Sequence, residues 1–382
     1  MSAHDTSVQR AMIRTVPAEL VLEDGSRFAG RRFGADGNVG GEVVFATGMV
    51  GYVESLTDPS YRGELLVLTF PLQGNYGVPA IEARAHESAR VQPQALIVGR
   101  VARHPNHPTS VQSLDAWLSA SGVPGLEGID TRGLTQRLRE HGTMRGWIVA
   151  AGLEGEALVA AKAEASSVDA DQVARDVSPR DVRTLGDGDV RILLVDSGVK
   201  EGISRALLDR KTTVVRAGLT SDLNRIAQDA DVDAIVLGNG PGDPKVLGDY
   251  VAQVRTLVDS GRPLLGICLG HQILALAMGG DTYKLPYGHR SHNQPVRETT
   301  TLRCSLTSQN HGYAVGRIPS GFRSWFDNLN DGTNEGIIHE ARPLRSVQFH
   351  PEAAPGPEDT RYLFDDFLAQ VRARRTELRA RR

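Results

Sequence analysis

The sequence is poor in several features that define particular protein classes. It holds two cysteines in 382 residues, too few for the disulfide framework of a small extracellular fold. No apolar run approaches the ~18 residues of a membrane-spanning helix, and the first twenty residues lack the apolar core of a signal peptide. Lys and Arg number 43 against 46 Asp and Glu, so no basic excess favours nucleic-acid binding. We therefore expect a cytoplasmic protein that binds neither membranes nor nucleic acid.

What is present fits a globular chain of two domains. Hydrophobic residues make up 40% and charged residues 23%, as in ordinary packed proteins. At roughly 150 residues per domain, the length suggests two. The composition shifts between Ala151 and Asp189, where an alanine-rich helical stretch precedes Gly- and Asp-rich segments. We predict a first domain at residues 1–150, a helical segment and linker at 151–189, and a second domain at 190–382.

The first domain is predicted to be rich in β-structure. Asp24-Gly25 stands between two short alternating runs, a typical signal for a β-hairpin because both residue types tolerate positive φ. Further strand-like runs are Glu42–Phe45, Glu64–Thr69 and Ala95–Val101. A helix is expected between Thr131 and His141, with capping residues at both ends.

The second domain alternates between strand-like and helix-like segments. This alternation predicts an open, mostly parallel α/β sheet, so the chain as a whole falls in the α/β class. Such folds place their chemistry in loops beyond the carboxyl ends of the strands. The predicted strands are Val190–Val195, Thr212–Val215, Ala234–Leu237 and Pro263–Ile267, and the predicted helices are Ile203–Leu208, Leu223–Ala227, Tyr250–Val258 and Gln272–Met278.

The strongest chemical signal surrounds Cys268. It follows a buried strand and precedes a helix, with Gly266 two residues before it and Gly270 two residues after it. Small residues at these positions permit the sharp strand-to-helix turn of a nucleophile elbow, here with sulfur as the nucleophile. The turn exposes the thiol at a helix N-terminus and leaves the backbone N–H of Leu269 free to face a reacting carbonyl. The alternative is a buried structural cysteine.

A thiol nucleophile needs a base and a group that orients the base. His350 and Glu352 are the candidates, because residues two apart in an extended segment point the same way. On their own they fit an ordinary surface turn better than a catalytic pair. A third segment, Gly238-Asn239-Gly240-Pro241-Gly242, follows a predicted strand and offers backbone N–H groups to an oxyanion. A plain tight turn is its alternative, and no P-loop nucleotide motif is present.

Taken together and in order, these three segments resemble the class I, or triad, glutamine amidotransferases. The resemblance implies that Cys268, His350 and Glu352 form a catalytic triad. Such a triad hydrolyses the side-chain amide of glutamine through a γ-glutamyl thioester and releases ammonia.

The N-terminal half resembles the front domain of the carbamoyl-phosphate synthase small-subunit family. The likeness rests on Gly41–Phe45, Gly51–Tyr61 and Gly128–Arg132, and later on Gln309–Val315 and His350–Pro357. It implies a heterodimer, or a higher assembly, with a large subunit that uses ATP and Mg²⁺ to make carbamoyl phosphate for arginine and pyrimidine synthesis. No cofactor is expected in this chain.

The resemblance also implies a set of glutamine contacts. Gly48 replaces a serine that the family often has, Tyr313 replaces the usual phenylalanine, and the loop His289–Pro295 departs from the family pattern. The implied contacts are Gly48, Gly240, Gly242, Leu269, Gln272, Asn310, Gly312 and Tyr313.

Other features are given ordinary structural interpretations. The spacing of His289 with His292, and of His104 with His107, lacks a completing ligand nearby, so no metal site is expected. Cys304 is expected to be a small core residue, and residues 372–382 a solvated helix end.

Two alternative functions stay open at this point. One is the amidotransferase subunit of another synthetase, of the anthranilate or GMP type, against which the front domain argues. The other is a non-catalytic scaffold subunit, against which the joint presence of Cys268, His350 and Glu352 argues.

Overall fold

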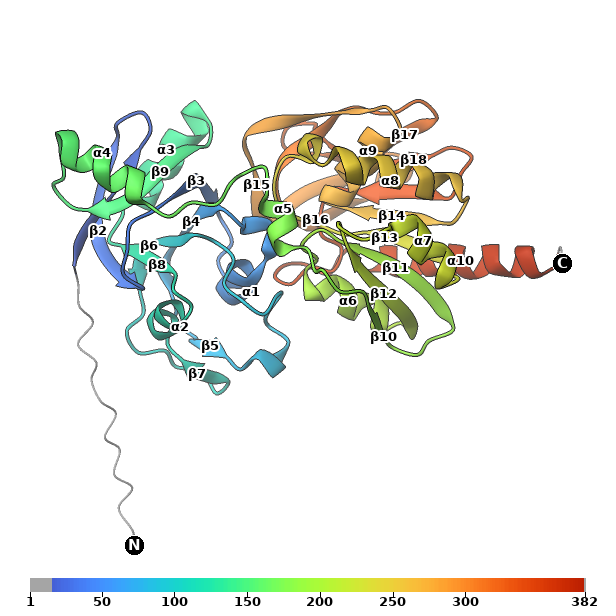
Figure 1. The fold of residues 1–382 in the computed structure, drawn as a ribbon, viewed down its shortest axis with the longest axis horizontal. Coiled ribbons are helices and arrows are strands. Elements are labelled where there is room, and N and C mark those ends of the chain that lie inside the picture. The colour runs from blue at the N-terminus through green and yellow to red at the C-terminus, as the bar shows by residue number, and fades with distance from the viewer. Residues whose placement is uncertain (1–15, 381–382) are drawn as a thin grey trace, which may run out of the picture.

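The structure, a computed structural model, describes residues 16–380 of the chain. Two bodies lie side by side, a β-barrel formed by the N-terminal half and a sheet flanked by helices formed by the C-terminal half (Figure 1). We call them the barrel domain (residues 17–150) and the sheet domain (residues 183–380). The first fifteen residues of the segment predicted to lack a signal peptide fall outside the described part. No helix among the described residues has the length and apolarity to cross a membrane.

The barrel domain is a closed barrel of seven strands in the order β1-β2-β8-β6-β4-β3-β9. The predicted hairpin is confirmed, because β1 and β2 pair antiparallel around Gly25, whose φ is 86°. The strands are β1(Pro17–Leu22), β2(Arg27–Gly34), β3(Val39–Ala46), β4(Glu64–Gln73), β6(Ala95–Val101), β8(Pro124–Glu127) and β9(Met144–Ala150). A small two-stranded sheet joins β5(Val78–Pro79) to β7(Ser110–Gln112).

Alternation along the barrel strands creates two hydrophobic clusters. On β4, Leu65 and Val67 pack in one cluster with α3(Thr131–His141), and Leu66 and Leu68 pack in the other. This second cluster contains α1(Tyr52–Thr57) and α2(Leu114–Ala120). The predicted helix is confirmed as α3, whose N-terminus is capped by the Asp130 side chain. The remaining short turns are η1(Pro59–Tyr61) and η2(Ile81–Ala83).

The connecting segment crosses from one domain to the other. It contains α4(Gly155–Glu164) and α5(Val173–Val177). Within the predicted linker, β10(Arg183–Leu185) pairs antiparallel with β12(Thr212–Gly218). The sheet of the second domain therefore begins before residue 190, the predicted start of that domain. The composition of residues 183–185 gave no signal for this short edge strand.

The sheet domain contains one ten-stranded sheet, in the order β10-β12-β11-β13-β14-β19-β18-β16-β15-β17. Strands β12, β11, β13, β14 and β19 run parallel, and β18, β16, β15 and β17 extend the sheet in antiparallel pairings. The four predicted strands are confirmed. The bounds not yet given are β11(Val190–Asp196), β13(Ala234–Leu237), β14(Leu264–Ile267), β15(Asp281–Glu298), β16(Cys304–Arg317), β17(Phe322–Asn328), β18(Asn334–His339) and β19(Leu344–Val347).

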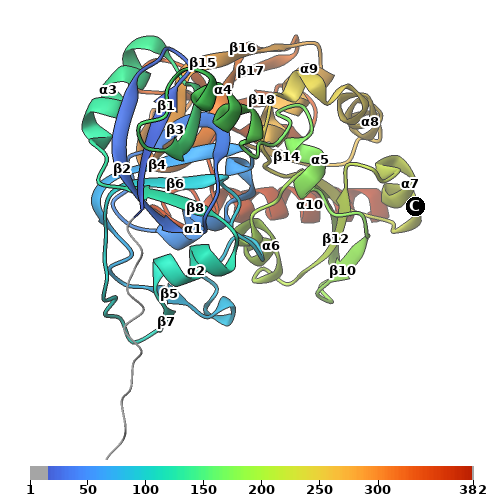
Figure 2. The same ribbon diagram turned by 60° about the vertical axis from the view of Figure 1, so that its left-hand side comes forward.

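Helices cover both faces of the parallel strands, as Figure 2 shows from a second direction. One hydrophobic cluster contains side chains of α7, α8 and α9, and the cluster on the other face contains side chains of α6 and α10. The helices are α6(Glu201–Leu208), α7(Leu223–Asp229), α8(Gly248–Asp259), α9(Leu269–Ala277) and α10(Tyr362–Ala380), with the short turn η3(Pro244–Val246). The predicted tail falls largely in α10, although residues 381–382 lie outside the described part.

The prediction for Cys304 is wrong. This residue is the first of β16, and it is exposed instead of buried. It follows a turn in which Leu302 has a φ of 60°. Cys304 therefore lies at the end of the sheet, where its side chain is exposed.

Candidate active site

Cys268 lies in a strained turn between β14 and α9. Its φ is 54° and its ψ is −107°, a backbone conformation that non-glycine residues rarely adopt and that is typical of functional sites. The flanking glycines are required by close packing. A Cβ at Gly266 would lie 2.6 Å from the Gly270 carbonyl oxygen, and a Cβ at Gly270 would lie 2.2 Å from the Leu237 carbonyl oxygen. The local geometry is that of the predicted nucleophile elbow.

The Cys268 thiol lies among backbone groups. Its side chain is 2% exposed, and Sγ lies 3.7 Å from the carbonyl oxygen of Asn310. Leu269 is the first residue of α9, so its N–H has no acceptor within the helix. The glycine-rich segment 238–242 lies close to Leu269, because a Cβ at Gly240 would lie 2.9 Å from Leu269 Cδ2. The two residues that are predicted to supply the oxyanion donors are thus in close contact.

His350 and Glu352 follow β19, and their side chains are in contact. His350 Nδ1 lies 2.7 Å from Glu352 Oε1, and both side chains are buried. His350 Nε2 has no hydrogen-bond partner, and the ring interacts electrostatically with Cys268. Burial by itself lowers the pKa of His350, but the negative charge of Glu352 and then Cys268 outweigh burial and an opposing Lys200 charge, and raise it to about 10. The protonated form of His350 is therefore favoured in the folded protein.

A buried lysine that the sequence analysis missed completes this cluster. Lys200, just before α6, has its Nζ 3.1 Å from Glu352 Oε1 and donates a hydrogen bond of 2.7 Å to the Ala353 carbonyl. Burial by itself raises the pKa of Glu352, but the Lys200 ammonium and then His350 outweigh it and lower this pKa to about 2. The only sequence signal was a cationic residue four positions after the end of the buried strand β11.

A cavity of about 750 Å³ opens at Cys268, along the junction of the two domains. It is lined by both the barrel domain and the sheet domain, and most of the predicted site residues line it. These are Gly240, Gly242, Cys268, Gln272, Asn310, Gly312 and Tyr313. The other four predicted site residues, Gly48, Leu269, His350 and Glu352, are not among the lining residues.

The space beside Gly48 is occupied by another side chain. A Cβ at Gly48 would lie 2.4 Å from Cε1 of His292, a ring that burial first and Lys200 second keep uncharged by lowering its pKa to about 4. The glycine at 48 and the histidine at 292 are therefore sterically linked, and the contact of Gly48 with glutamine remains a prediction.

Two predicted contacts have part of their hydrogen-bonding capacity in use. The Gln272 amide nitrogen donates to the Tyr313 carbonyl at 2.8 Å and to Gln348 Oε1 at 3.1 Å. Asn310 uses its side-chain amide to hydrogen-bond Asp58 Oδ2 of the barrel domain at 2.9 Å. Asn310 thus offers its backbone to the thiol and its side chain to the other domain.

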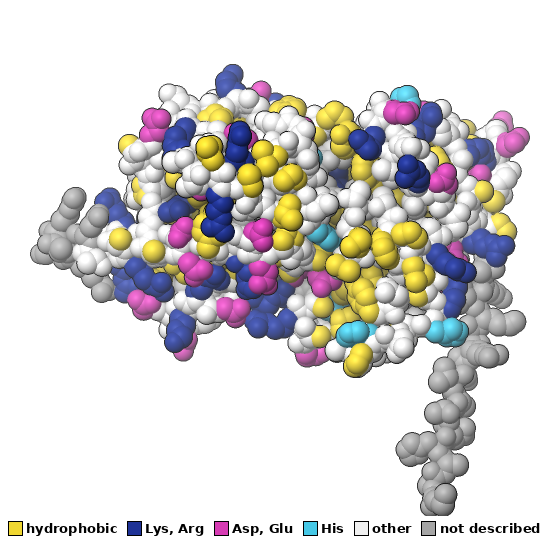
Figure 3. Space-filling view, turned by 180° about the vertical axis from the view of Figure 1, so that it is seen from behind, with side chains coloured by type: hydrophobic (Ala, Val, Ile, Leu, Met, Phe, Trp, Pro, Cys, Tyr) yellow, Lys and Arg dark blue, Asp and Glu magenta, His cyan; other side chains and the backbone are white. Residues whose placement is uncertain are grey.

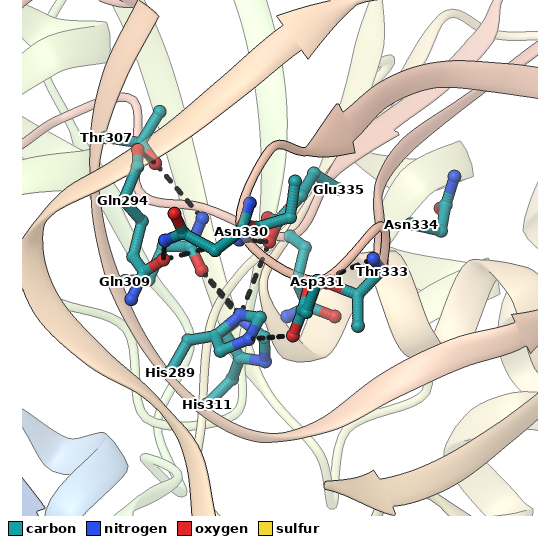
Figure 4. A network of polar contacts seen from close by, with 12 residues as sticks. His289, Gln294, Thr307, Gln309, His311, Asn330, Asp331, Thr333, Asn334 and Glu335 are labelled. Atoms are coloured by element: carbon teal, nitrogen blue, oxygen red, sulfur yellow. Dashed lines mark hydrogen bonds and ion pairs between the residues drawn. The ribbon is translucent and has the colours of Figure 1, made fainter.

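Behind β16, a network of polar side chains supports the strand that carries Asn310 and Gly312 (Figure 4). His289 lies 2.8 Å from Asp331 and 3.0 Å from Gln309, and His311 lies 3.1 Å from the same Gln309 oxygen. With Glu335, the two histidines are also the one cluster among the described residues whose ligand atoms could approach a metal ion together. Because their nitrogens face hydrogen-bond partners within the protein, we interpret the cluster as a structural network.

Comparison with known proteins places this site in a family. The family model described as "Glutamine amidotransferase class-I" matches residues 193–370, and the sheet domain is accordingly a class I glutamine amidotransferase domain. The model "Carbamoyl-phosphate synthase small chain, CPSase domain" matches residues 20–148.

Similar full-length proteins extend the match over nearly the whole chain. The arginine-specific small chain of carbamoyl phosphate synthase from Aspergillus niger is 44% identical over 379 residues, which cover 96% of this chain and 82% of that protein. The corresponding protein of Neurospora crassa is 42% identical over 367 residues, covering 93% and 80%. The multifunctional protein CAD of Squalus acanthias is 45% identical over 368 residues, or 93% of this chain but 16% of its own length. The chain belongs to the carbamoyl phosphate synthase small chain family.

Proposed function

We propose that the chain is the glutamine-hydrolysing subunit of a carbamoyl phosphate synthase. The single observation that carries this proposal is the geometry at Cys268, where a strained elbow presents the thiol beside His350, which is itself hydrogen-bonded to Glu352. A thiol, a base and an orienting carboxylate are the parts that acyl transfer to sulfur requires. The matched front domain, residues 20–148, favours this synthase over amidotransferases of the anthranilate or GMP type.

The mechanism begins when His350 takes the proton of the Cys268 thiol and the resulting thiolate attacks the side-chain amide carbon of glutamine. The oxyanion of the tetrahedral intermediate accepts hydrogen bonds from the N–H groups of Leu269 and Gly240. His350 gives its proton to the departing ammonia, and the γ-glutamyl thioester remains on Cys268. His350 then removes a proton from water, which hydrolyses the thioester to glutamate. Glu352 holds the imidazole in place throughout.

The ammonia is consumed by a large synthetase subunit, the partner that small chains of this family imply. We propose a heterodimer in the cytoplasm, in which the large subunit holds ATP and Mg²⁺ and this chain holds no cofactor. Carbamoyl phosphate would then feed arginine and pyrimidine synthesis. Figure 3 shows hydrophobic side chains gathered on the barrel half of one face. The barrel domain exposes Met49 (69%) and Val50 (62%) directly after β3, apolar surface of the kind that subunit contacts cover.

The test measures glutamate released from glutamine by the purified chain, alone and with a large subunit, ATP and bicarbonate. We expect strong stimulation by the partner and formation of carbamoyl phosphate. Glutamate without carbamoyl phosphate would point to another synthetase, and no hydrolysis under any condition would favour a scaffold. Cys268→Ser in the complex should abolish synthesis from glutamine while synthesis from free ammonia continues. Loss of both activities would contradict this division of labour.

A further inference from the structure

A buried cation lines the cavity at a place the triad does not use. Arg290 is 7% exposed and belongs to the segment 289–295, which departs from the family pattern; it was expected to be a loop but lies within strand β15. In the sheet it stands directly opposite Asn310, whose carbonyl oxygen contacts the thiol. Arg290 therefore begins level with the reacting sulfur and extends along the cavity.

The guanidinium is held by both domains. One terminal nitrogen donates to the Tyr287 carbonyl at 3.1 Å, and the other donates to Glu64 Oε1 of the barrel domain at 2.6 Å. A guanidinium carries five N–H groups, so these contacts fix its position and leave further hydrogens for a ligand. The nitrogen bonded to Glu64 lies 3.4 Å from the position that a Cβ on Gly312 would occupy.

The spacing along β16 matches the length of glutamine. Asn310 and Gly312 are two residues apart in an extended strand, a separation of roughly 6–7 Å. The four C–C bonds from the amide carbon of glutamine to its carboxylate carbon span about 5 Å when extended. A glutamine that lies along β16 with its amide carbon at Cys268 would place its α-carboxylate near Gly312, where Arg290 presents its guanidinium.

We propose that Arg290 binds the α-carboxylate of glutamine, with Glu64 as the residue that positions it. This inference rests on the proposed glutaminase function and adds a specificity-determining residue to it. Arginine is suited to the role because its planar fork matches a carboxylate and stays charged at any physiological pH. The pocket for the amino-acid head group is then completed by the barrel domain through the Glu64 contact.

The experiment compares glutamine with 4-aminobutanamide, which is glutamine without its α-carboxylate. The large-subunit complex is assayed with the wild-type chain, with Glu64→Gln, and with the double variant Glu64→Gln/Arg290→Gln. The double variant avoids leaving an unpaired carboxylate in a buried position. We expect the wild type to prefer glutamine in kcat/KM, Glu64→Gln to lose part of that preference because Arg290 is held less firmly, and the double variant to lose about 10- to 100-fold of it. The loss should appear in the KM for glutamine, with kcat for 4-aminobutanamide unchanged.

Controls separate this inference from a folding defect and from the proposed function. Lys284→Gln removes another cavity-lining cation, one paired with Glu42, and should keep the preference for glutamine. Labelling of Cys268 by iodoacetamide, which has no carboxylate, should proceed equally in all variants. An unchanged preference in the folded double variant would overturn the role of Arg290 while leaving the glutaminase function intact. A wild-type complex in which glutamine is neither hydrolysed nor protects Cys268 from iodoacetamide would overturn both.

Discussion

Replacing Lys200 with methionine is the most informative single change in this molecule. The ammonium is buried, lies 3.1 Å from Glu352 and donates to the Ala353 carbonyl. Removing one partner of a buried ion pair typically costs about 3–5 kcal/mol, because the remaining charge is left uncompensated. At about 2–4 °C per kcal/mol for a domain of this size, 3 kcal/mol lowers Tm by roughly 6–12 °C.

Lys200→Met should also change the pH dependence of glutamine hydrolysis. The Lys200 charge lowers the pKa of both Glu352 and His350, so its removal raises both values. Because Glu352 must be ionised to orient His350, the acid limb of the kcat/KM profile should move toward neutral pH. Thermal unfolding at pH 7 and glutamate release between pH 5 and 9 test these two effects.

Two variants make this test decisive. Lys245→Met breaks an ion pair with Asp281 in which both side chains are about half exposed, and such pairs contribute about 0–1 kcal/mol. Lys200→Met/Glu352→Gln removes both buried charges, so it should be more stable than Lys200→Met yet remain inactive. A Lys200→Met protein that unfolds like Lys245→Met and keeps the wild-type acid limb would refute the argument.

Three further predictions concern other parts of the chain. Gly270→Ala should destabilise the protein by about 1–3 kcal/mol in urea unfolding, because its Cβ would lie 2.2 Å from a carbonyl oxygen. The control Gly248→Ala places its Cβ in open space and should not destabilise the protein. Equal unfolding midpoints for the two variants would contradict the steric argument. Burial, opposed by Arg290, raises the pKa of Glu64 to about 7 from 4.5, so the folded protein binds this proton more tightly and stability falls as pH rises from about 4.5 to 7. The free energy of unfolding should fall by about 3 kcal/mol over this pH range, at 1.36 kcal/mol per pKa unit. Glu64→Gln should not show this fall when its urea unfolding is measured across the same range. Parallel pH profiles of wild type and Glu64→Gln would contradict the prediction. Glutamine should slow alkylation of buried Cys268 but not of exposed Cys304 in peptide mapping by mass spectrometry, and equal protection of both would exclude a substrate effect at the cavity.

Much of the site could be predicted because its functional residues lie in short contiguous motifs. The elbow needs small residues two positions before and two positions after Cys268. In the structure, a Cβ on Gly266 or Gly270 would clash with a backbone carbonyl oxygen, which confirms this requirement. The contact of His350 with Glu352 was also predicted, but the reason given for it was wrong. His350 forms an isolated bridge with Ser308, and residues 351–352 form a turn instead of extended backbone. The parallel strands of the sheet domain were predicted for a different reason, the alternation of strand-like and helix-like segments along the chain.

Features that depend on tertiary contact were out of reach. Lys200 acquires its role only because the turn after β19 brings Glu352 and Ala353 to it. The strand β10 is three residues long, too short for periodicity to appear. The burial of Cys304 was predicted from residue type alone, and the end of β16 overrode that preference. The link between Gly48 and His292 joins segments far apart in the chain.

Asn310 connects the nucleophile of the sheet domain to the barrel domain. Its carbonyl oxygen contacts the sulfur of Cys268, and its side chain is anchored to Asp58 in the other domain. A rotation of the barrel against the sheet would therefore pull on the very strand that borders the nucleophile. The position of the strand beside the nucleophile therefore depends on how the two domains sit against each other.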